Sequence, residues 1–306
     1  MKLFCDIIKT IISILEGKSM ENEYMKLNNG VQIPKLGLGT WLIDDSLVVQ
    51  AVRDAVKIGY RHIDTAQAYE NEHGVGEGIR SCDVPRNEIF VTSKVAAENK
   101  TYNSAINSIN ETLQKMNLEY IDMMIIHSPQ PWKEVNQSEN RYHKENIEVW
   151  QALEDAYKTG KVRAIGLSNF LISDIKNILQ NCTIKPMVNQ ILVHISNTPL
   201  ELIDFCKQNG IIVEAYSPIA HGEILQNAQI AEIAHKYGVS IPQLCIRYCL
   251  QLDLVTLPKT ANTIHMKDNV AVDFVIGDED MNSLKCFEHI KDYGKSSFFP
   301  VYGGKL

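Results

Sequence analysis

The chain has 306 residues, of which 45% are hydrophobic and 22% are charged, and its formal net charge is −7. This composition is typical of an acidic globular protein, and it lacks the long basic runs of a nucleic-acid binder. The seven cysteines are scattered at irregular spacing, which argues against a disulfide framework and against a zinc site. We therefore expect a cytoplasmic protein with no nucleic-acid partner and no metal ion.

The first 24 residues differ in character from the rest of the chain. Their apolar stretch, 3–15, is too short for a bilayer span, which takes about 20 apolar residues. Asp6 and the lack of a small-residue cleavage site argue against a signal peptide. Two interpretations stay open: an amphipathic appendage, or an extension upstream of the true start. We expect residues 1–24 to be a poorly packed extension, residues 25–306 to form a single domain, and no contact with a membrane.

Beyond this segment, apolar strands and amphipathic helices alternate. Asn28-Asn-Gly30 is a strong turn signal between two short strands, 25–27 and 31–33, and predicts a hairpin. Ser46 is expected to cap the first helix, which Gly59 ends. The other strands are expected at 36–39, 62–64, 89–94, 120–127, 162–168, 187–190, 211–216 and 254–257. The other helices are expected at 71–80, 104–116, 145–158, 173–180, 199–208 and 264–269, with two short helices before the last strand.

Eight strand–helix units can be counted from Leu36 onward. The alternation predicts parallel strands, and eight units make a closed barrel. We therefore expect an α/β protein, a (β/α)8 TIM barrel with an N-terminal β-hairpin. A doubly wound sheet is the alternative, but it favours a glycine-rich phosphate turn after its first strand. The Gly37–Gly39 stretch lacks the third glycine of that turn, and the Gly74–Gly78 stretch has the wrong spacing.

Titratable residues gather at the ends of three consecutive predicted strands. Asp64, Lys94 and His127 end the second, third and fourth strands, and Tyr69 lies in the loop after the second. A barrel places its active site at the C-terminal ends of its strands, so these four side chains are expected to converge. Each alone is often a cap or a core residue, whereas four on adjacent strand ends predict a functional site.

These four residue types suit proton transfer to a carbonyl oxygen. A phenol has a pKa of about 10, and a nearby ammonium stabilises the phenolate and lowers that pKa. Lys94 would supply the ammonium, Asp64 would hold Lys94 in place, and His127 would orient the carbonyl. We therefore expect Tyr69 to be the general acid, with its pKa moved towards neutral pH, while a bound donor delivers hydride.

Later strand ends carry residues that suit a nicotinamide cofactor. Amide side chains suit a carboxamide, an aromatic face suits the ring, and a cation beside a helix start suits a phosphate. The residues expected to make these contacts are Ser168, Asn169, Gln190, Tyr216, Ser217, Lys259 and Thr260.

Three stretches, Gly59–Glu72, Leu118–Pro129 and Lys161–Phe170, resemble the aldo-keto reductase family, and the resemblance extends over residues 25–306. It implies NAD(P)H-dependent reduction of aldehydes and ketones on a (β/α)8 barrel. It places the family's catalytic tetrad on Asp64, Tyr69, Lys94 and His127. It implies 2′-phosphate and adenine contacts at Lys259, Thr260, His265, Asp268 and Asn269, beside nicotinamide contacts at Ser168, Asn169, Gln190 and Tyr216. Thr40, Trp41, Asp64 and Ser217 complete the expected cofactor site.

Two positions depart from the family pattern. His265 stands where most NADPH-preferring members have Arg, and a mostly neutral imidazole holds a phosphate less well than a guanidinium does. We therefore expect NADPH as the preferred cofactor, with measurable use of NADH. Ser128 stands where many members carry Trp, so the pocket is expected to lose one aromatic wall there and to keep another at Trp41. The expected substrate contacts are Trp41, Tyr69, His127 and Ser128.

The sequence thus predicts a monomeric reductase of small carbonyl compounds, similar to the prokaryotic-type aldehyde, dicarbonyl and keto-sugar reductases. Two alternatives stay open: a non-catalytic cofactor-binding subunit, and an enzyme that works mainly as an alcohol dehydrogenase. Three segments, 129–144, 221–226 and 296–306, are expected to decide the substrate.

Overall fold

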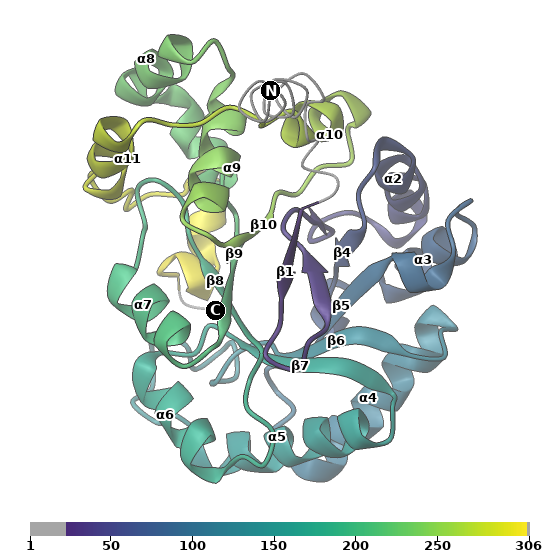
Figure 1. Ribbon diagram of the computed structural model, residues 1–306. Helices are drawn as coiled ribbons and strands as arrows, with labels where there is room; N and C mark the ends of the chain where they lie inside the picture. The colour runs from purple at the N-terminus through teal and green to yellow at the C-terminus, as the bar shows by residue number, and fades with distance from the viewer. Residues whose placement is uncertain (1–22, 305–306) are drawn as a thin grey trace, which may run out of the picture.

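The computed structural model describes residues 23–304, and its central element is a sheet of eight parallel strands that neighbour one another in chain order. Isolated bridges from Leu36 to Thr256 and from Gly39 to Lys259 join the first strand region to the last, which closes the sheet. The predicted (β/α)8 barrel is therefore confirmed (Figure 1). The strands are β3 (Leu38–Gly39), β4 (His62–Asp64), β5 (Phe90–Val95), β6 (Ile121–Ile126), β7 (Val162–Ser168), β8 (Val188–Leu192), β9 (Ile212–Tyr216) and β10 (Val255–Leu257).

Amphipathic helices surround the barrel (Figure 1). In α4, for example, Thr101 caps the first turn through Ser104, and Ala105, Ile109 and Met116 recur on the buried face. The helices are α2 (Asp45–Ile58), α3 (Glu72–Arg80), α4 (Tyr102–Met116), α5 (His143–Lys158), α6 (Ile172–Asn181), α7 (Leu200–Gln208), α8 (Ala228–Lys236), α9 (Ile241–Gln251), α10 (Thr263–Val270) and α11 (Asp278–Lys285). Within residues 23–304, none of them is long and apolar enough to cross a membrane.

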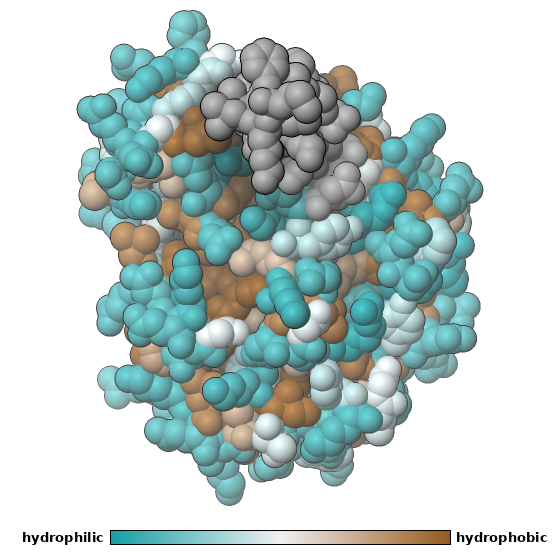
Figure 2. Space-filling model, in the orientation of Figure 1, coloured by the Kyte–Doolittle hydropathy of each residue, from teal (hydrophilic) through white to brown (hydrophobic). Residues whose placement is uncertain are grey.

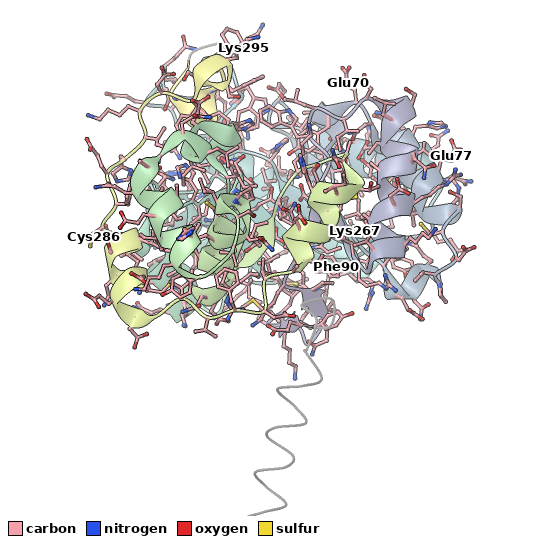
Figure 3. The ribbon with its side chains drawn as sticks, turned by 90° about the horizontal axis from the view of Figure 1, so that it is seen from above. Glu70, Glu77, Phe90, Lys267, Cys286 and Lys295 are labelled. Carbon is pink, nitrogen blue, oxygen red and sulfur yellow. The ribbon has the colours of Figure 1, made fainter. Side chains whose placement is uncertain are left out.

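The N-terminal hairpin of β1 (Tyr24–Lys26) and β2 (Gln32–Pro34) covers one end of the barrel (Figure 1). Gly30 takes the positive φ that its turn requires, and Asn28 Nδ2 donates to the Pro186 carbonyl, 2.9 Å away. Hydrophilic side chains rim this face, with hydrophobic ones nearer its centre (Figure 2). Turned by 90°, the hairpin lies at one end, and Glu70 and Lys295 at the other (Figure 3). The hairpin therefore covers the end of the barrel opposite to Glu70, the neighbour of Tyr69 in the chain.

Charged residues lie inside the barrel together with its apolar side chains. Parallel pairing sets Gln190 opposite Glu214 in the register of β8 and β9, and both side chains are buried. Asp64 and Lys94 are buried as well. A buried charge is costly unless it is paired, so these residues must satisfy one another.

Some local predictions were wrong. Ser46 was expected to cap the first helix, but Asp44 holds the cap position, two residues earlier, and α2 begins at Asp45. The sequence prediction contained neither α11 nor the short 3-10 turns Gly294–Phe298 and Pro300–Tyr302 that follow it. Most of the predicted extension, 1–24, lies outside the described residues.

Candidate active site

A cavity of about 480 Å³ opens at the C-terminal ends of the strands. Three of the four residues expected to converge, Asp64, Tyr69 and His127, line it, and Lys94 is fully buried behind them. Of the other predicted site residues, those in the lining are Trp41, Ser168, Asn169, Gln190, Tyr216, Ser217 and Lys259.

Lys94 connects a buried carboxylate to the phenol of Tyr69. Its Nζ lies 2.7 Å from Asp64 Oδ2, 2.8 Å from the Thr65 carbonyl oxygen and 3.3 Å from Tyr69 Oη. Burial by itself lowers the pKa of Lys94, but the charge of Asp64 and the interactions with Asp64 and Tyr69, hydrogen bonds included, outweigh it and raise the pKa. The ammonium therefore stays charged at neutral pH beside the phenolic oxygen.

A short 3-10 turn, Gln67–Tyr69, holds the phenol in this position. The Gln67 amide anchors the turn, since its Nε2 donates to the Ser108 carbonyl at 3.0 Å and its Oε1 accepts from Ala96 N at 2.8 Å. The Lys94 ammonium also lies 4.8 Å from the centre of the Tyr69 ring. The loop after β4 thus places Tyr69 over the end of β5.

The pKa of Tyr69 is raised, contrary to the expectation from sequence. Burial is the largest influence and disfavours the phenolate; Lys94 lowers the pKa, and Asp64 raises it further. The predicted effect of Lys94 is therefore present but is smaller than that of burial. A phenol with a high pKa stays protonated at neutral pH, which is the state that a proton donor needs.

His127 follows the last residue of β6 and faces Tyr69, with their ring centres 5.6 Å apart. Burial and the nearby charge of Lys94 hold its pKa well below the usual value, so the imidazole is neutral and carries one N–H. Its Nδ1 has no hydrogen-bond partner among the described residues. A neutral imidazole at the cavity wall can donate one hydrogen bond to a ligand oxygen.

Side chains at the C-terminal ends of β7 and β9 continue the same wall. Asn169 Nδ2 donates to the His127 carbonyl at 3.0 Å, and Tyr216 Oη donates to Asn169 Oδ1 at 2.8 Å. Asn169 takes a positive φ, which turns the chain sharply after Ser168. The predicted tetrad and the predicted nicotinamide contacts therefore form one continuous polar surface.

Other predicted residues lie outside the cavity lining. Thr40 is buried and donates from Oγ1 to the Asp64 carbonyl at 3.0 Å. Ser128 is also buried, and its carbonyl accepts from Lys100 Nζ at 2.9 Å. The remaining four are Thr260, which precedes α10, and His265, Asp268 and Asn269 of α10. His265 and Asp268 are exposed, whereas Thr260 and Asn269 are largely buried.

Aromatic residues that the sequence prediction did not include form much of the outer cavity. Trp132 packs edge-on against His127 with ring centres 5.0 Å apart, so an aromatic wall is present although residue 128 is Ser. The expected loss of that wall was wrong, because the following loop supplies it. Elsewhere in the lining, Trp41 packs against Phe299 of the C-terminal segment, with ring centres 4.8 Å apart.

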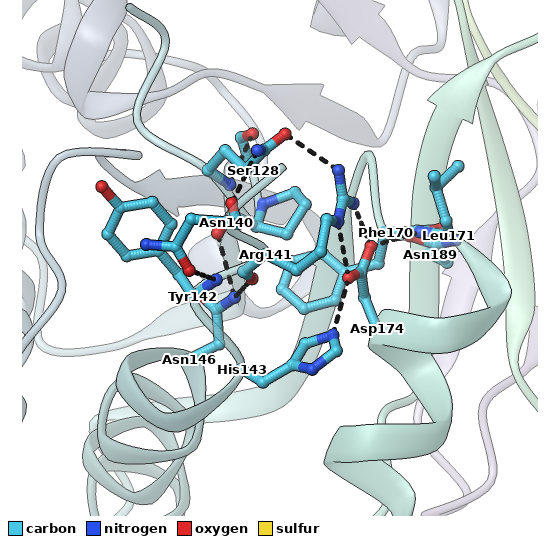
Figure 4. A network of polar contacts seen from close by, with 12 residues as sticks. Ser128, Asn140, Arg141, Tyr142, His143, Asn146, Phe170, Leu171, Asp174 and Asn189 are labelled. Atoms are coloured by element: carbon cyan, nitrogen blue, oxygen red, sulfur yellow. Dashed lines mark hydrogen bonds and ion pairs between the residues drawn. The ribbon is translucent and has the colours of Figure 1, made fainter. Parts of the chain in front are cut away.

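The loop that carries Trp132 is anchored by a partly buried ion pair (Figure 4). Arg141 donates from Nε to Asp174 Oδ1 at 3.0 Å and from Nη2 to Asp174 Oδ2, and its Nη1 donates to Gln130 Oε1 at 2.8 Å. Asp174 belongs to α6, so these contacts tie both ends of the 129–142 loop to that helix.

The model of the Aldo/keto reductase family matches residues 35–288 of the chain. Glyoxal reductase of Bacillus subtilis is 39% identical over 262 residues, which cover 85% of this chain and 91% of that protein. The 9,11-endoperoxide prostaglandin H2 reductase of Trypanosoma cruzi is 39% identical over 281 residues, 90% of this chain and 95% of that protein. An aldo-keto reductase of Bombyx mori in complex with NADP has a TM-score of 0.80 at 32% identity, with 92% and 98% of the two chains covered.

The chain belongs to the aldo/keto reductase family. The resemblance found in the sequence is therefore confirmed, and the chain is an NAD(P)H-dependent oxidoreductase.

Proposed function

We propose that the chain reduces small aldehydes and dicarbonyl compounds to alcohols with NADPH, with Tyr69 as the general acid. The observation that carries this proposal is the contact series from Asp64 through Lys94 to Tyr69 at the base of a cavity. The relatives named glyoxal reductase and aldehyde reductase support the substrate class.

In this proposal each residue of the tetrad has one task. The neutral His127 donates a hydrogen bond to the carbonyl oxygen and fixes its position. Tyr69 then transfers its phenolic proton to that oxygen, and the Lys94 ammonium stabilises the phenolate that remains. Asp64 keeps Lys94 charged and in place. When bound, NADPH supplies the hydride that the carbonyl carbon receives.

The residues at the cavity suit the cofactor. Both Nε2 hydrogens of Gln190 are donated inside the barrel, to Asp64 at 2.8 Å and to Glu214 at 2.9 Å, which leaves its Oε1 to accept from a carboxamide. Burial lowers the pKa of Lys259, and no ion pair or hydrogen bond to its Nζ is found among residues 23–304. An exposed cation that lines the cavity shortly before the N-terminus of α10 is suited to a phosphate.

Cofactor preference follows from the residues around that phosphate. Lys259 and Thr260 favour NADPH, and His265, which stands where Arg is usual in the family, allows measurable use of NADH. Asp268 and Asn269 would contact the adenine end, and Thr40, Trp41 and Ser217 would complete the site.

We further propose that the protein works as a cytoplasmic monomer whose single domain is formed by residues 25–306. One chain supplies all the residues of the proposed site, so no partner subunit is needed for catalysis. The described cysteines are unpaired, as expected in a reducing compartment.

The test is to follow nicotinamide absorbance with short aldehydes, glyoxal-type dicarbonyls and keto-sugars, and with the matching alcohols in reverse. We expect reduction to exceed oxidation at neutral pH, because the raised pKa keeps Tyr69 protonated. Cofactor binding without turnover of any carbonyl would instead support the non-catalytic alternative. Faster alcohol oxidation at pH 7 would support the dehydrogenase alternative.

A further inference from the structure

Glu214 is a fully buried carboxyl group that the proposed mechanism does not use. It lies in the middle of β9, its side chain points into the barrel, and its exposed fraction is 0%. It does not line the cavity, but Asp64 and Gln190, to which it is connected, both do. Glu214 therefore lies directly beneath the proposed active site.

One amide group connects Glu214 to the tetrad. Gln190 Nε2 donates to Glu214 Oε2 at 2.9 Å and to Asp64 Oδ1 at 2.8 Å, so the two carboxyl groups share one nitrogen. The other oxygen of Asp64 accepts from Lys94, which in turn contacts Tyr69. Glu214 is thus four contacts away from the phenol. Its Oε1 has no hydrogen-bond partner among the described residues.

The charge balance at this point favours a neutral Glu214. The titratable groups that act on it are Asp64 of β4 and Lys94 of β5, while β8 presents the uncharged Gln190 and β10 pairs with it through apolar Val255. Two ionised carboxylates beside one ammonium would leave an excess negative charge in the interior. Burial and the charge of Asp64 raise the pKa of Glu214 to about 8, and Gln190 and Lys94 only partly oppose this.

We propose that Glu214 is a positioning residue of the active site, which in its neutral form fixes Gln190 between the two carboxyl groups and in its ionised form hinders proton transfer from Tyr69. The inference rests on the proposed function, because it assumes that Tyr69 is the general acid. A negative charge beneath Asp64 opposes formation of the phenolate, since like charges in a low-dielectric site raise the pKa of an acid. Carbonyl reduction should therefore slow as the pH rises through about 8.

The experiment compares pH profiles of kcat for Glu214→Gln and the native protein between pH 6.5 and 9. A glutamine accepts the same hydrogen bond but cannot ionise. We expect the ratio of kcat at pH 9 to kcat at pH 6.5 to be about 3- to 10-fold larger in the variant, because the phenol of Tyr69 is not weakened as an acid when no charge forms beneath Asp64. The same ratio in variant and native protein, with or without a uniform loss of activity, would show a packing role only and would overturn the proposal.

Glu72 provides the matched control. It is also buried with a raised pKa, but it contacts Ser93 and Thr112 on the outer side of the barrel wall. Glu72→Gln should keep the native pH ratio, and a change equal to that of Glu214→Gln would refute the specific role of Glu214. Infrared spectra of Glu72→Gln add a measurement that does not need a folded Glu214 variant. In this variant the infrared band of the protonated Glu214 carboxyl should disappear as the pH rises through about 8. If no band is lost there, the proposal is contradicted.

A third variant separates this inference from the proposed function. If Tyr69→Phe reduces carbonyls at the native rate, the proposed function fails. If Tyr69→Phe loses activity while Glu214→Gln leaves the pH ratio unchanged, only the role of Glu214 fails.

Discussion

Arg141→Ala should loosen the 129–142 loop and destabilise the fold. Asp174 is 1% exposed and accepts hydrogen bonds from Arg141 and from Leu171 N, the latter at 2.9 Å. His143 Nε2 lies 3.3 Å from the same carboxylate. Removal of Arg141 leaves a buried carboxylate with the backbone donor and an imidazole, and it also frees Gln130 Oε1.

The expected loss in the free energy of unfolding follows from the burial of the two partners. Breaking a buried ion pair by removing one partner costs about 3–5 kcal/mol. The Arg141 side chain is 27% exposed and Asp174 retains other donors, so solvent screening reduces the expected loss to about 2–3 kcal/mol. At about 2.1 cal/mol/K of unfolding entropy per residue, that loss corresponds to a fall of roughly 3–5 °C in Tm for a domain of this size.

Urea denaturation and steady-state kinetics measure the two effects separately. We expect the lower stability together with a higher KM, because Trp132 on this loop lines the cavity and packs on His127. Lys158→Ala is the matched control, since the Lys158–Asp155 pair is exposed at 51% and 47% and should contribute less than about 0.5 kcal/mol. Equal stability losses in Arg141→Ala and Lys158→Ala would refute the reasoning.

Three other variants test separate parts of the account. His265→Arg should tighten NADPH binding by roughly 10–150-fold, from about 1.5–3 kcal/mol for a charge-assisted hydrogen bond, with NADH binding unchanged in fluorescence titrations; equal effects on both cofactors would remove His265 from the phosphate site. Deletion of residues 1–22 should leave Tm and kcat unchanged, since residues from 23 onward include the closed barrel; a fall of several degrees would contradict the predicted domain boundary. The pKa of Glu214 is raised from 4.5 to about 8. Between these two pH values the carboxyl group is ionised in the unfolded chain but protonated in the fold, so native stability falls as the pH rises from 4.5 towards 8. The free energy of unfolding of Glu214→Gln, minus that of the native protein, should therefore increase by on the order of 3 kcal/mol from pH 5 to pH 8. If urea denaturation shows the same difference at both pH values, the raised pKa is contradicted.

The barrel and the inner site could be predicted because both depend on local patterns. Several short apolar strands carry a polar residue at or next to their C-terminal end, and parallel topology brings those ends to the same edge. Asp64, Lys94 and His127 follow this rule, and the structure gathers them with Tyr69 although they lie at the ends of three different strands.

The outer cavity could not be predicted in the same way. Trp132 and Phe299 lie in segments without helical or strand periodicity, and only tertiary packing brings them to the cavity. The raised pKa of Tyr69 was missed for a related reason, because the depth of burial decides the balance between desolvation and Lys94. Glu214 reads as an isolated acid in an apolar strand, and its pairing with Gln190 becomes visible only in the register of β8 and β9.

Turnover by Tyr69→Phe is the most direct test of the central claim. The substitution keeps the ring between Lys94 and His127 and removes only the hydroxyl, so NADPH binding should be nearly unchanged. Single-turnover reduction of a good aldehyde substrate at pH 7 should slow by about 10²–10⁴-fold, the usual loss when a general acid is removed. Reduction at close to the native rate would contradict the assignment of Tyr69 as the proton donor.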